Sequence, residues 1–225
     1  MFRTTTGWVV SPTDLVDTLE CDHRSALKTA LAARVEGAPA PADIDPLVAQ
    51  HGLAHEQAEL ERLSALVEVA RMPDPRPEDA SLAAAAQATA DAMAAGVPVI
   101  YQGSFHHRLT EPDPGGQAVS FHGRADFLIR SDLDPATGRT RTPAPSDWTY
   151  EPWDTKLARR PGPGAVVQLA AYAHAVSVAT GRAPQHMHLL TGDNHTHTLP
   201  TADFTPILST VTTRLLTLLA TEPAL

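Results

Sequence analysis

The sequence predicts a single domain of the mixed α/β (α+β) class, built on a mixed β-sheet. Its 225 residues, 43% of them hydrophobic, are enough for one domain with a sizeable core. The expected elements run in the order helices, three strands, a helix, two short strands and a final helix, an order typical of a sheet flanked by helices. No repeat at solenoid spacing interrupts this order.

The first part of the chain, about residues 11–95, is expected to be helical. Ser11, Pro12 and Asp14 favour a helix start, because serine can cap, proline suits the first turn and aspartate can complete a capping box. An alanine-rich stretch later in this part ends at Gly96, a residue typical of helix termini. The expected helices span about 11–35, 45–69 and 80–95, separated by a linker at 37–46 and a loop at 72–78.

The second part, about residues 97–200, is expected to form the sheet. Stretches rich in β-branched and aromatic residues favour strands, and Gly162-Pro163-Gly164 breaks the chain before a helix that Gly181 closes. The expected strands are 97–109, 118–131, 148–158, 184–194 and 195–200; the helices are 165–180 and a C-terminal amphipathic helix at 203–220; and 132–147 is a long, exposed polar connection.

Several classes of protein are disfavoured by composition. No apolar run approaches the 18 residues of a membrane span, and the N-terminus lacks the features of a secretory signal. The single cysteine, Cys21, excludes an internal disulfide and a four-cysteine zinc or iron–sulfur site within this chain. We therefore expect a cytoplasmic protein without an iron–sulfur cluster.

The charge pattern combines an acidic total with a local basic stretch. The net charge is −9, so a nucleic-acid partner would need local positive charge. The chain has only two lysines, Lys28 and Lys156, so a lysine at 156 hints at a role that arginine cannot fill. The basic stretch consists of Arg124, Arg130, Arg139, Arg141, Lys156, Arg159 and Arg160, which ordinary solvated surface would also explain.

Two aspartates on neighbouring expected strands are candidate metal ligands. Asp154 and Lys156 project from one face, with Thr155 turned into the sheet, although an isolated D-x-K is more often a surface ion pair. Asp126 interrupts an otherwise apolar strand, and a buried carboxylate needs a cation or another partner. Adjacent strands lie about 4.8 Å apart, so Asp126 and Asp154 can share Mg²⁺ or Mn²⁺; the alternative is an Asp126–Arg124 pair.

Two expected helices carry further polar side chains at helical spacing. Gly52 and His55 share one face of the second helix, and His51 and His55 stand four residues apart, although a lone helix histidine is commonly a solvated residue. Gln168 and Tyr172 share a face of the helix after the third strand, where both can hydrogen-bond to phosphate or to a lysine.

In this order, G-x-x-H, G-x-x-D-F, D-x-K and Q-x-x-x-Y resemble the RecB-like branch of the PD-(D/E)XK nucleases, over roughly residues 8–192. Ser11-Pro12-Thr13-Asp14-Leu15 and Cys21-Asp22-His23 also resemble the opening of RecB-like nuclease domains often fused to helicases. The resemblance implies a restriction-endonuclease-like mixed sheet flanked by helices, with an N-terminal helical segment. It implies cleavage of DNA, a helicase or another nucleic-acid-processing protein as a partner, and Mg²⁺ or Mn²⁺ held by His55, Asp126 and Asp154. It further implies a catalytic Lys156 supported by Gln168 and Tyr172.

The chain departs from that pattern in places, and two other interpretations stay open. Cysteines that bind an iron–sulfur cluster in related members are missing, so Cys21 is expected to be structural. Pro152 predicts a bulge or a late strand start before Asp154. One alternative is a nuclease-fold module that binds DNA or protein without cutting. The other is a zinc scaffold on His186, His188, His195 and His197, although alternating histidines are at least as often plain edge residues of a strand.

Overall fold

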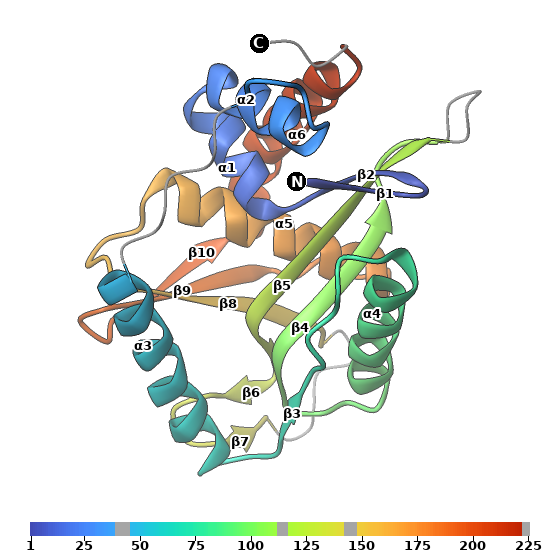
Figure 1. Ribbon diagram of the computed structural model, residues 1–225. Coiled ribbons are helices and arrows are strands. Elements are labelled where there is room, and N and C mark those ends of the chain that lie inside the picture. The colour runs from blue at the N-terminus through green and yellow to red at the C-terminus, as the bar shows by residue number, and fades with distance from the viewer. Residues whose placement is uncertain (39–45, 112–116, 142–147, 222–225) are drawn as a thin grey trace.

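The computed structural model describes residues 1–38, 46–111, 117–141 and 148–221, and it shows a mixed sheet with helices packed around it (Figure 1). The strands are β1 (Phe2–Thr4), β2 (Gly7–Val10), β3 (Val69–Arg71), β4 (Val99–Arg108), β5 (Ala118–Arg130), β6 (Leu133–Asp134), β7 (Arg139–Thr140), β8 (Tyr150–Lys156), β9 (His186–Thr191) and β10 (Thr196–Pro200). The helices are α1 (Pro12–Glu20), α2 (Asp22–Ala32), α3 (Pro46–Ser64), α4 (Asp79–Ala94), α5 (Pro163–Thr180) and α6 (Thr201–Leu219).

The main sheet branches around its longest strand, β5. One edge of β5 pairs antiparallel with β4 from Ser120 to Ile129, and β4 in turn pairs with β3. On the other edge, β2 pairs parallel with the start of β5, at 118–121, whereas β8 pairs antiparallel with its end, at 127–130. Beyond β8 the sheet continues through β9 and β10, and beyond β2 it ends at β1. The predicted mixed sheet is therefore confirmed.

Helices cover the sheet in layers. The apolar helix α5 crosses the strands, and α1 and α6 pack on its outer side, with α2 beside them (Figure 1). The largest core cluster lies here and includes Ile100, Leu128, Leu169 and Val211, each almost fully buried. A second, smaller cluster joins Leu60 and Leu63 of α3 to Phe127 of β5. Helix α4 packs along β4. Within the described residues, no helix is both long and apolar enough to cross a membrane.

The structure corrects the expected N-terminal part in several places. The single helix expected to reach about Val35 is two helices, because Cys21 has extended backbone angles (φ −164°, ψ 113°) that end α1 and begin α2. Three short strands that join the main sheet were not predicted: β1 and β2 precede residue 11, and β3 lies within the part expected to be helical. Of the predicted linker, 37 and 38 are non-helical and 46 begins α3; 39–45 lie outside the described residues. The loop at 72–78 and the alanine-rich helix are confirmed.

The sheet region follows the prediction closely, with two exceptions. Its five predicted strands and its helix are all present, and Gly96 and Gly181 end helices with left-handed φ of +72° and +69°. The polar connection contains a small two-stranded sheet, β6 and β7, while 142–147 lie outside the described residues. The bulge or late start expected at Pro152 was wrong: β8 begins at Tyr150 and Pro152 stays in register with Leu128. Pairing with β9 begins only at Trp153, after the proline that lacks a donor.

Candidate active site

The candidate site lies where β2 and β8 separate along one edge of β5. Residues 122–126 of β5 fall between the two pairings on that edge, and Asp126 stands at the β8 side of the opening. The β5–β8 register ends at Phe127 and Trp153, so the next residues outward are Asp126 and Asp154. The fork thus places two carboxylates from neighbouring strands at one opening in the sheet, as the sequence predicted.

Asp126 is held by the strand opposite it. The backbone N–H of Thr155 donates to Asp126 Oδ2 at 2.8 Å, and the Thr155 hydroxyl donates to the same oxygen at 2.9 Å. Thr155 was expected to turn into the sheet, but its hydroxyl contacts the candidate metal ligand Asp126 instead. The alternative partner for Asp126 is also excluded, because Arg124 makes its ion pair with Asp74. Asp126 is partly buried, and its other oxygen, Oδ1, makes no hydrogen bond or ion pair with any of the described residues.

Asp154 and Lys156 project together from β8, as predicted. The Asp154 side chain is fully buried, and its Oδ2 forms an ion pair with Nζ of Lys156, whose side chain is about one-third exposed. On α5, the Gln168 amide donates to Asp154 Oδ1 at 3.4 Å and to the Tyr172 hydroxyl at 3.2 Å. The pair predicted to lie on one helical face, Gln168 and Tyr172, therefore does so and faces Asp154.

A glycine lets α5 approach the sheet at this point. A Cβ on Gly123 of β5 would lie 2.9 Å from Tyr172 Cε1, a distance that requires a shift, and 3.0 Å from Phe121 Cζ, which is a tight contact. The first residue of the G-x-x-D motif thus has a packing role, because it makes room for the tyrosine ring that contacts Gln168.

Helix α3 contributes a residue, Glu56, that the sequence analysis did not select. Glu56 Oε1 accepts a hydrogen bond from Gln102 of β4, and its charge acts on Asp126, Asp154 and Lys156. Gln102 has a left-handed φ of +56°, rare for a residue with a side chain, at the position of β4 facing Asp126 across the register. A sequence signal did exist, since Glu56 adjoins His55, but a helix acid among other acids gave no reason to select it.

The two candidate histidines on α3 behave differently. His51 is exposed, whereas His55 is partly buried and its Nε2 is a buried atom without a hydrogen-bond partner in the described part of the chain. No contact joins His55 to Asp126 or Asp154 there. Because Gly52 shares a helical face with His55, it was expected to let α3 approach another element closely. A Cβ on Gly52 would meet nothing within 4 Å, so this expectation was wrong.

The site carries more negative charge than its one lysine balances. Burial, then the charges of Asp154 and Glu56, raises the pKa of Asp126 to about 7. Burial also raises the pKa of Asp154, against the opposing effect of Lys156. Burial alone would lower the pKa of Lys156, but the charges of Asp154 and Asp126 outweigh it and the pKa is raised. Lys156 is therefore held as a cation, while the carboxylates repel one another.

The donor chemistry suits a hard divalent cation, which would relieve this repulsion. The carboxylate oxygens of Asp126 and Asp154 are ligands of the kind that Mg²⁺ and Mn²⁺ prefer, and the unpartnered Nε2 of His55 is a further donor on the adjoining helix. Among the described residues, however, no group of three or more His, Cys, Asp or Glu side chains is already arranged to hold a metal ion.

The four histidines of the zinc alternative do not converge. His188 lies opposite Thr198 in the β9–β10 register, while His197 lies opposite Leu189, so His188 and His197 belong to opposite faces of the sheet. His188 Nε2 contacts Glu151 Oε2 at 2.8 Å and its Nδ1 contacts Thr198 Oγ1 at 3.0 Å, with its ring stacked on Trp153. His186 contacts the same glutamate, and His195 packs edge-on against His197. These contacts give His186 and His188 ordinary structural partners, whereas His197 Nε2 is a buried atom without a hydrogen-bond partner in the described part of the chain.

Comparison with known proteins adds little to this picture. No family model matches the sequence, and no curated protein matches it. A solved structure described as "Crystal structure of SSO0001" is similar over 93% of this chain and 76% of that chain, with 14% sequence identity and a TM-score of 0.42. A likeness at this level supports no conclusion about family or activity.

Proposed function

We propose that this protein is a metal-dependent nuclease of the PD-(D/E)XK type, close to the RecB-like branch, that hydrolyses phosphodiester bonds of DNA. One observation carries the proposal: Asp126, Asp154 and Lys156 meet at the fork of the sheet, where the carboxylates outnumber the cation. A mixed sheet flanked by helices is compatible with the restriction-endonuclease-like core that this proposal requires.

In the proposed reaction the residues of the chain have separate tasks. Asp126 and Asp154 hold the divalent cation, with His55 as the nitrogen donor on α3. When bound, the cation polarises the scissile phosphate and lowers the pKa of a water molecule. Lys156 orients the attacking water through its ammonium group and offsets the charge that develops on the phosphate. Gln168, hydrogen-bonded to Asp154 and Tyr172, fixes the direction of the buried carboxylate.

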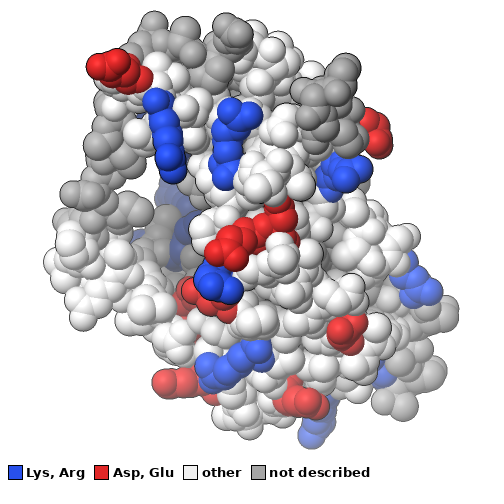
Figure 2. Space-filling model, turned by 45° about the vertical axis from the view of Figure 1, so that its right-hand side comes forward, with Lys and Arg blue, Asp and Glu red and all other residues white. Residues whose placement is uncertain are grey.

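The surface charge bears on how DNA would be held. Lys/Arg and Asp/Glu side chains are interspersed on the face shown in Figure 2, which displays no uninterrupted basic band among its described residues. The predicted basic stretch is also partly neutralised, since Arg124 pairs with Asp74 and Arg130 with Asp132. We therefore propose that DNA is engaged through few phosphate contacts, and that a helicase or another nucleic-acid-processing protein supplies additional affinity.

A second candidate function is a nuclease-fold module that binds DNA without cutting it. The observation in its favour is that Lys156 forms an ion pair with Asp154 and that Thr155 donates two hydrogen bonds to Asp126 Oδ2. The lysine and both carboxylates therefore already have partners. The two functions differ in a direct assay on labelled single- and double-stranded DNA. The enzyme cleaves with Mg²⁺ or Mn²⁺ and stops in EDTA, and Lys156→Ala abolishes cleavage in a folded protein. Metal-independent binding without cleavage would favour the module instead.

A further inference from the structure

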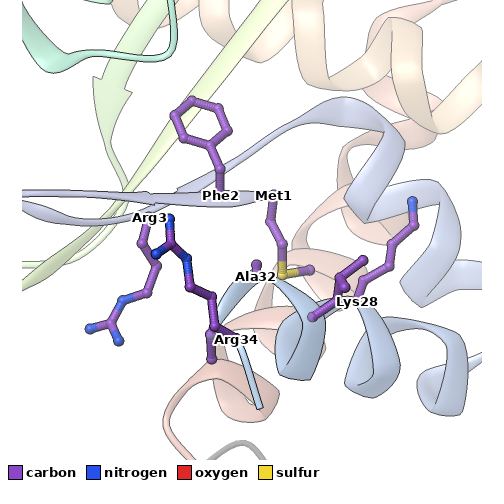
Figure 3. A pocket seen from close by; sticks show the side chains of 8 residues that line it. Met1, Phe2, Arg3, Lys28, Ala32 and Arg34 are labelled. Carbon is purple, nitrogen blue, oxygen red and sulfur yellow. The ribbon is translucent and has the colours of Figure 1, made fainter. Parts of the chain in front are cut away.

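A pocket lies between β1 and the C-terminal end of α2, away from the residues assigned to the candidate active site (Figure 3). Its volume is about 670 Å³, which is within the range of pockets that hold small organic ligands. Residues 1–3 form one side and residues 28 and 31–34 the other. The pocket shares no lining residue with the fork at Asp126 and Asp154.

Among the described residues, the polar side chains that line this pocket are all cationic. They are Arg3, Lys28 and Arg34, and no acidic side chain of the described residues joins them. Lys28 already has a partner, because its amine pairs with Asp17, and Figure 3 shows this side chain pointing away from the two arginines. Arg3 lies over the Trp8 ring at 5.0 Å, and neither Arg3 nor Arg34 makes an ion pair in the described part of the chain. In a protein of net charge −9, two unneutralised guanidinium groups at one pocket form a local anion-attracting site.

Arg34 occupies a backbone position that normally favours glycine. Its φ is +60°, and Val35 N–H donates to Ala30 O at 2.9 Å, which is the bond pattern that ends a helix with a left-handed residue. A residue with a Cβ is strained in this conformation, and such outliers concentrate at functional sites. Figure 3 shows the Arg34 side chain rising from the end of α2 toward β1, where Arg3 begins.

We propose that this pocket binds a nucleoside phosphate, either free or as the phosphorylated end of a nucleic-acid strand. The planar forks of Arg3 and Arg34 suit the oxygens of a phosphate group, which a guanidinium can contact with two parallel hydrogen bonds. The half-buried side chains of Met1, which Figure 3 shows between β1 and α2, and of Leu31 supply apolar surface for the sugar and base. The inference does not rest on the proposed nuclease activity.

Calorimetric titration of the full chain in EDTA tests this assignment. The probes are deoxyadenosine monophosphate, deoxyadenosine, inorganic phosphate, and an oligothymidylate with and without a 5′-phosphate. We expect one nucleotide to bind per chain, with deoxyadenosine at least tenfold weaker. Preference for the 5′-phosphorylated oligonucleotide over the mononucleotide assigns the pocket to strand ends, and the reverse preference assigns it to free nucleotides.

Three variants locate the binding and separate it from general charge effects. Arg3→Gln/Arg34→Gln should weaken nucleotide binding at least tenfold, whereas Arg139→Gln on β7, a substitution at an exposed arginine of the separate small sheet, should leave it unchanged. Arg34→Gly should weaken binding while raising the melting temperature, because glycine relieves the left-handed backbone. The proposal is overturned if no nucleotide saturates the protein at millimolar concentration, if deoxyadenosine binds equally well, or if Arg139→Gln is as damaging as the double variant.

Discussion

Replacing Asp126 with asparagine removes one of the carboxylates that crowd the sheet fork and keeps the shape of the side chain. The amide oxygen of asparagine can still accept the two hydrogen bonds from Thr155, at 2.8 and 2.9 Å in the parent. What disappears is the negative charge, whose burial and repulsion by Asp154 and Glu56 raise the pKa of Asp126 from 3.8 to about 7. We therefore expect Asp126→Asn to stabilise the metal-free protein at neutral and alkaline pH.

The magnitude follows from the size of that shift. One pKa unit corresponds to about 1.4 kcal/mol, so a rise from 3.8 to about 7 sets an upper limit of roughly 4 kcal/mol on the cost of ionising Asp126. Asp126 retains some contact with solvent and shares its repulsion with Asp154, which reduces the cost. We expect a gain of about 2 kcal/mol in the free energy of unfolding for the variant at pH 8.

The pH dependence has a definite sign. Because the pKa of Asp126 is raised in the folded state, the folded protein retains a proton that the unfolded chain has lost between about pH 4 and pH 7. Stability of the parent due to this group therefore falls as the pH rises through that window. The advantage of Asp126→Asn should be near zero at pH 4, grow up to pH 7 and stay constant above it.

Denaturant unfolding in EDTA at several pH values measures this difference directly. Asp193→Asn is a matched control, because Asp193 is an exposed carboxylate whose pKa is lowered chiefly by its hydrogen bond from Thr191, so its neutralisation should not stabilise the protein. A variant at Asp126 that is less stable than the parent at pH 8, or whose advantage is the same at pH 4, would refute the charge crowding described here.

Three further predictions concern the metal, the histidines and the packing of α5. Mn²⁺ at 100 times its dissociation constant should stabilise the parent by about 2.7 kcal/mol, seen as a higher melting temperature, and this shift should vanish in Asp126→Asn; an unchanged melt at millimolar Mn²⁺ argues against a metal site. In a metal titration of cleavage, Mn²⁺ should support cleavage at a lower concentration than Mg²⁺. His55→Ala should weaken Mn²⁺ binding far more than His51→Ala, since His51 is exposed. Equal effects of the two variants would show that His55 is not a metal ligand. Gly123→Ala should lower the free energy of unfolding by about 1–3 kcal/mol, because its Cβ would lie 2.9 Å from Tyr172 Cε1, and a melting temperature equal to that of the parent would show that the ring has room to move.

Patterns local in sequence predicted most of the sheet region. Alternating and β-branched residues marked β4, β5 and β8, and Gly181 marked the end of α5, because strand and helix-end signals depend on neighbouring residues. The same reasoning placed Asp126 near Asp154, since it needs only that consecutive strands pair. Local patterns did not predict β1, β2 and β3. These strands are only three or four residues long, and they form by pairing with an edge of the main sheet.

The contribution of α3 to the site depends on tertiary packing and was harder to predict. His55 was selected by a motif, yet it is the neighbouring Glu56 whose charge acts on both aspartates. Helical phase decides which of two adjacent residues points toward the sheet, and the weak amphipathic pattern of α3 did not define it. The left-handed φ of Gln102 was not predictable either, because glutamine is not a residue type that favours this conformation and its hydrogen bond to Glu56 joins residues far apart in sequence.

The two lysines of the chain offer the most direct test of the proposed chemistry. Lys156→Arg and Lys28→Arg make the same substitution at the same net charge, but only Lys156 pairs with the buried Asp154 at the fork, while Lys28 pairs with Asp17. The measurement is the single-turnover rate of DNA cleavage with saturating Mn²⁺. We predict that Lys28→Arg cleaves at the parent rate and that Lys156→Arg loses at least about a hundredfold, because a guanidinium cannot replace a compact ammonium beside the attacking water. Cleavage by Lys156→Arg at the parent rate would contradict the assignment of this site.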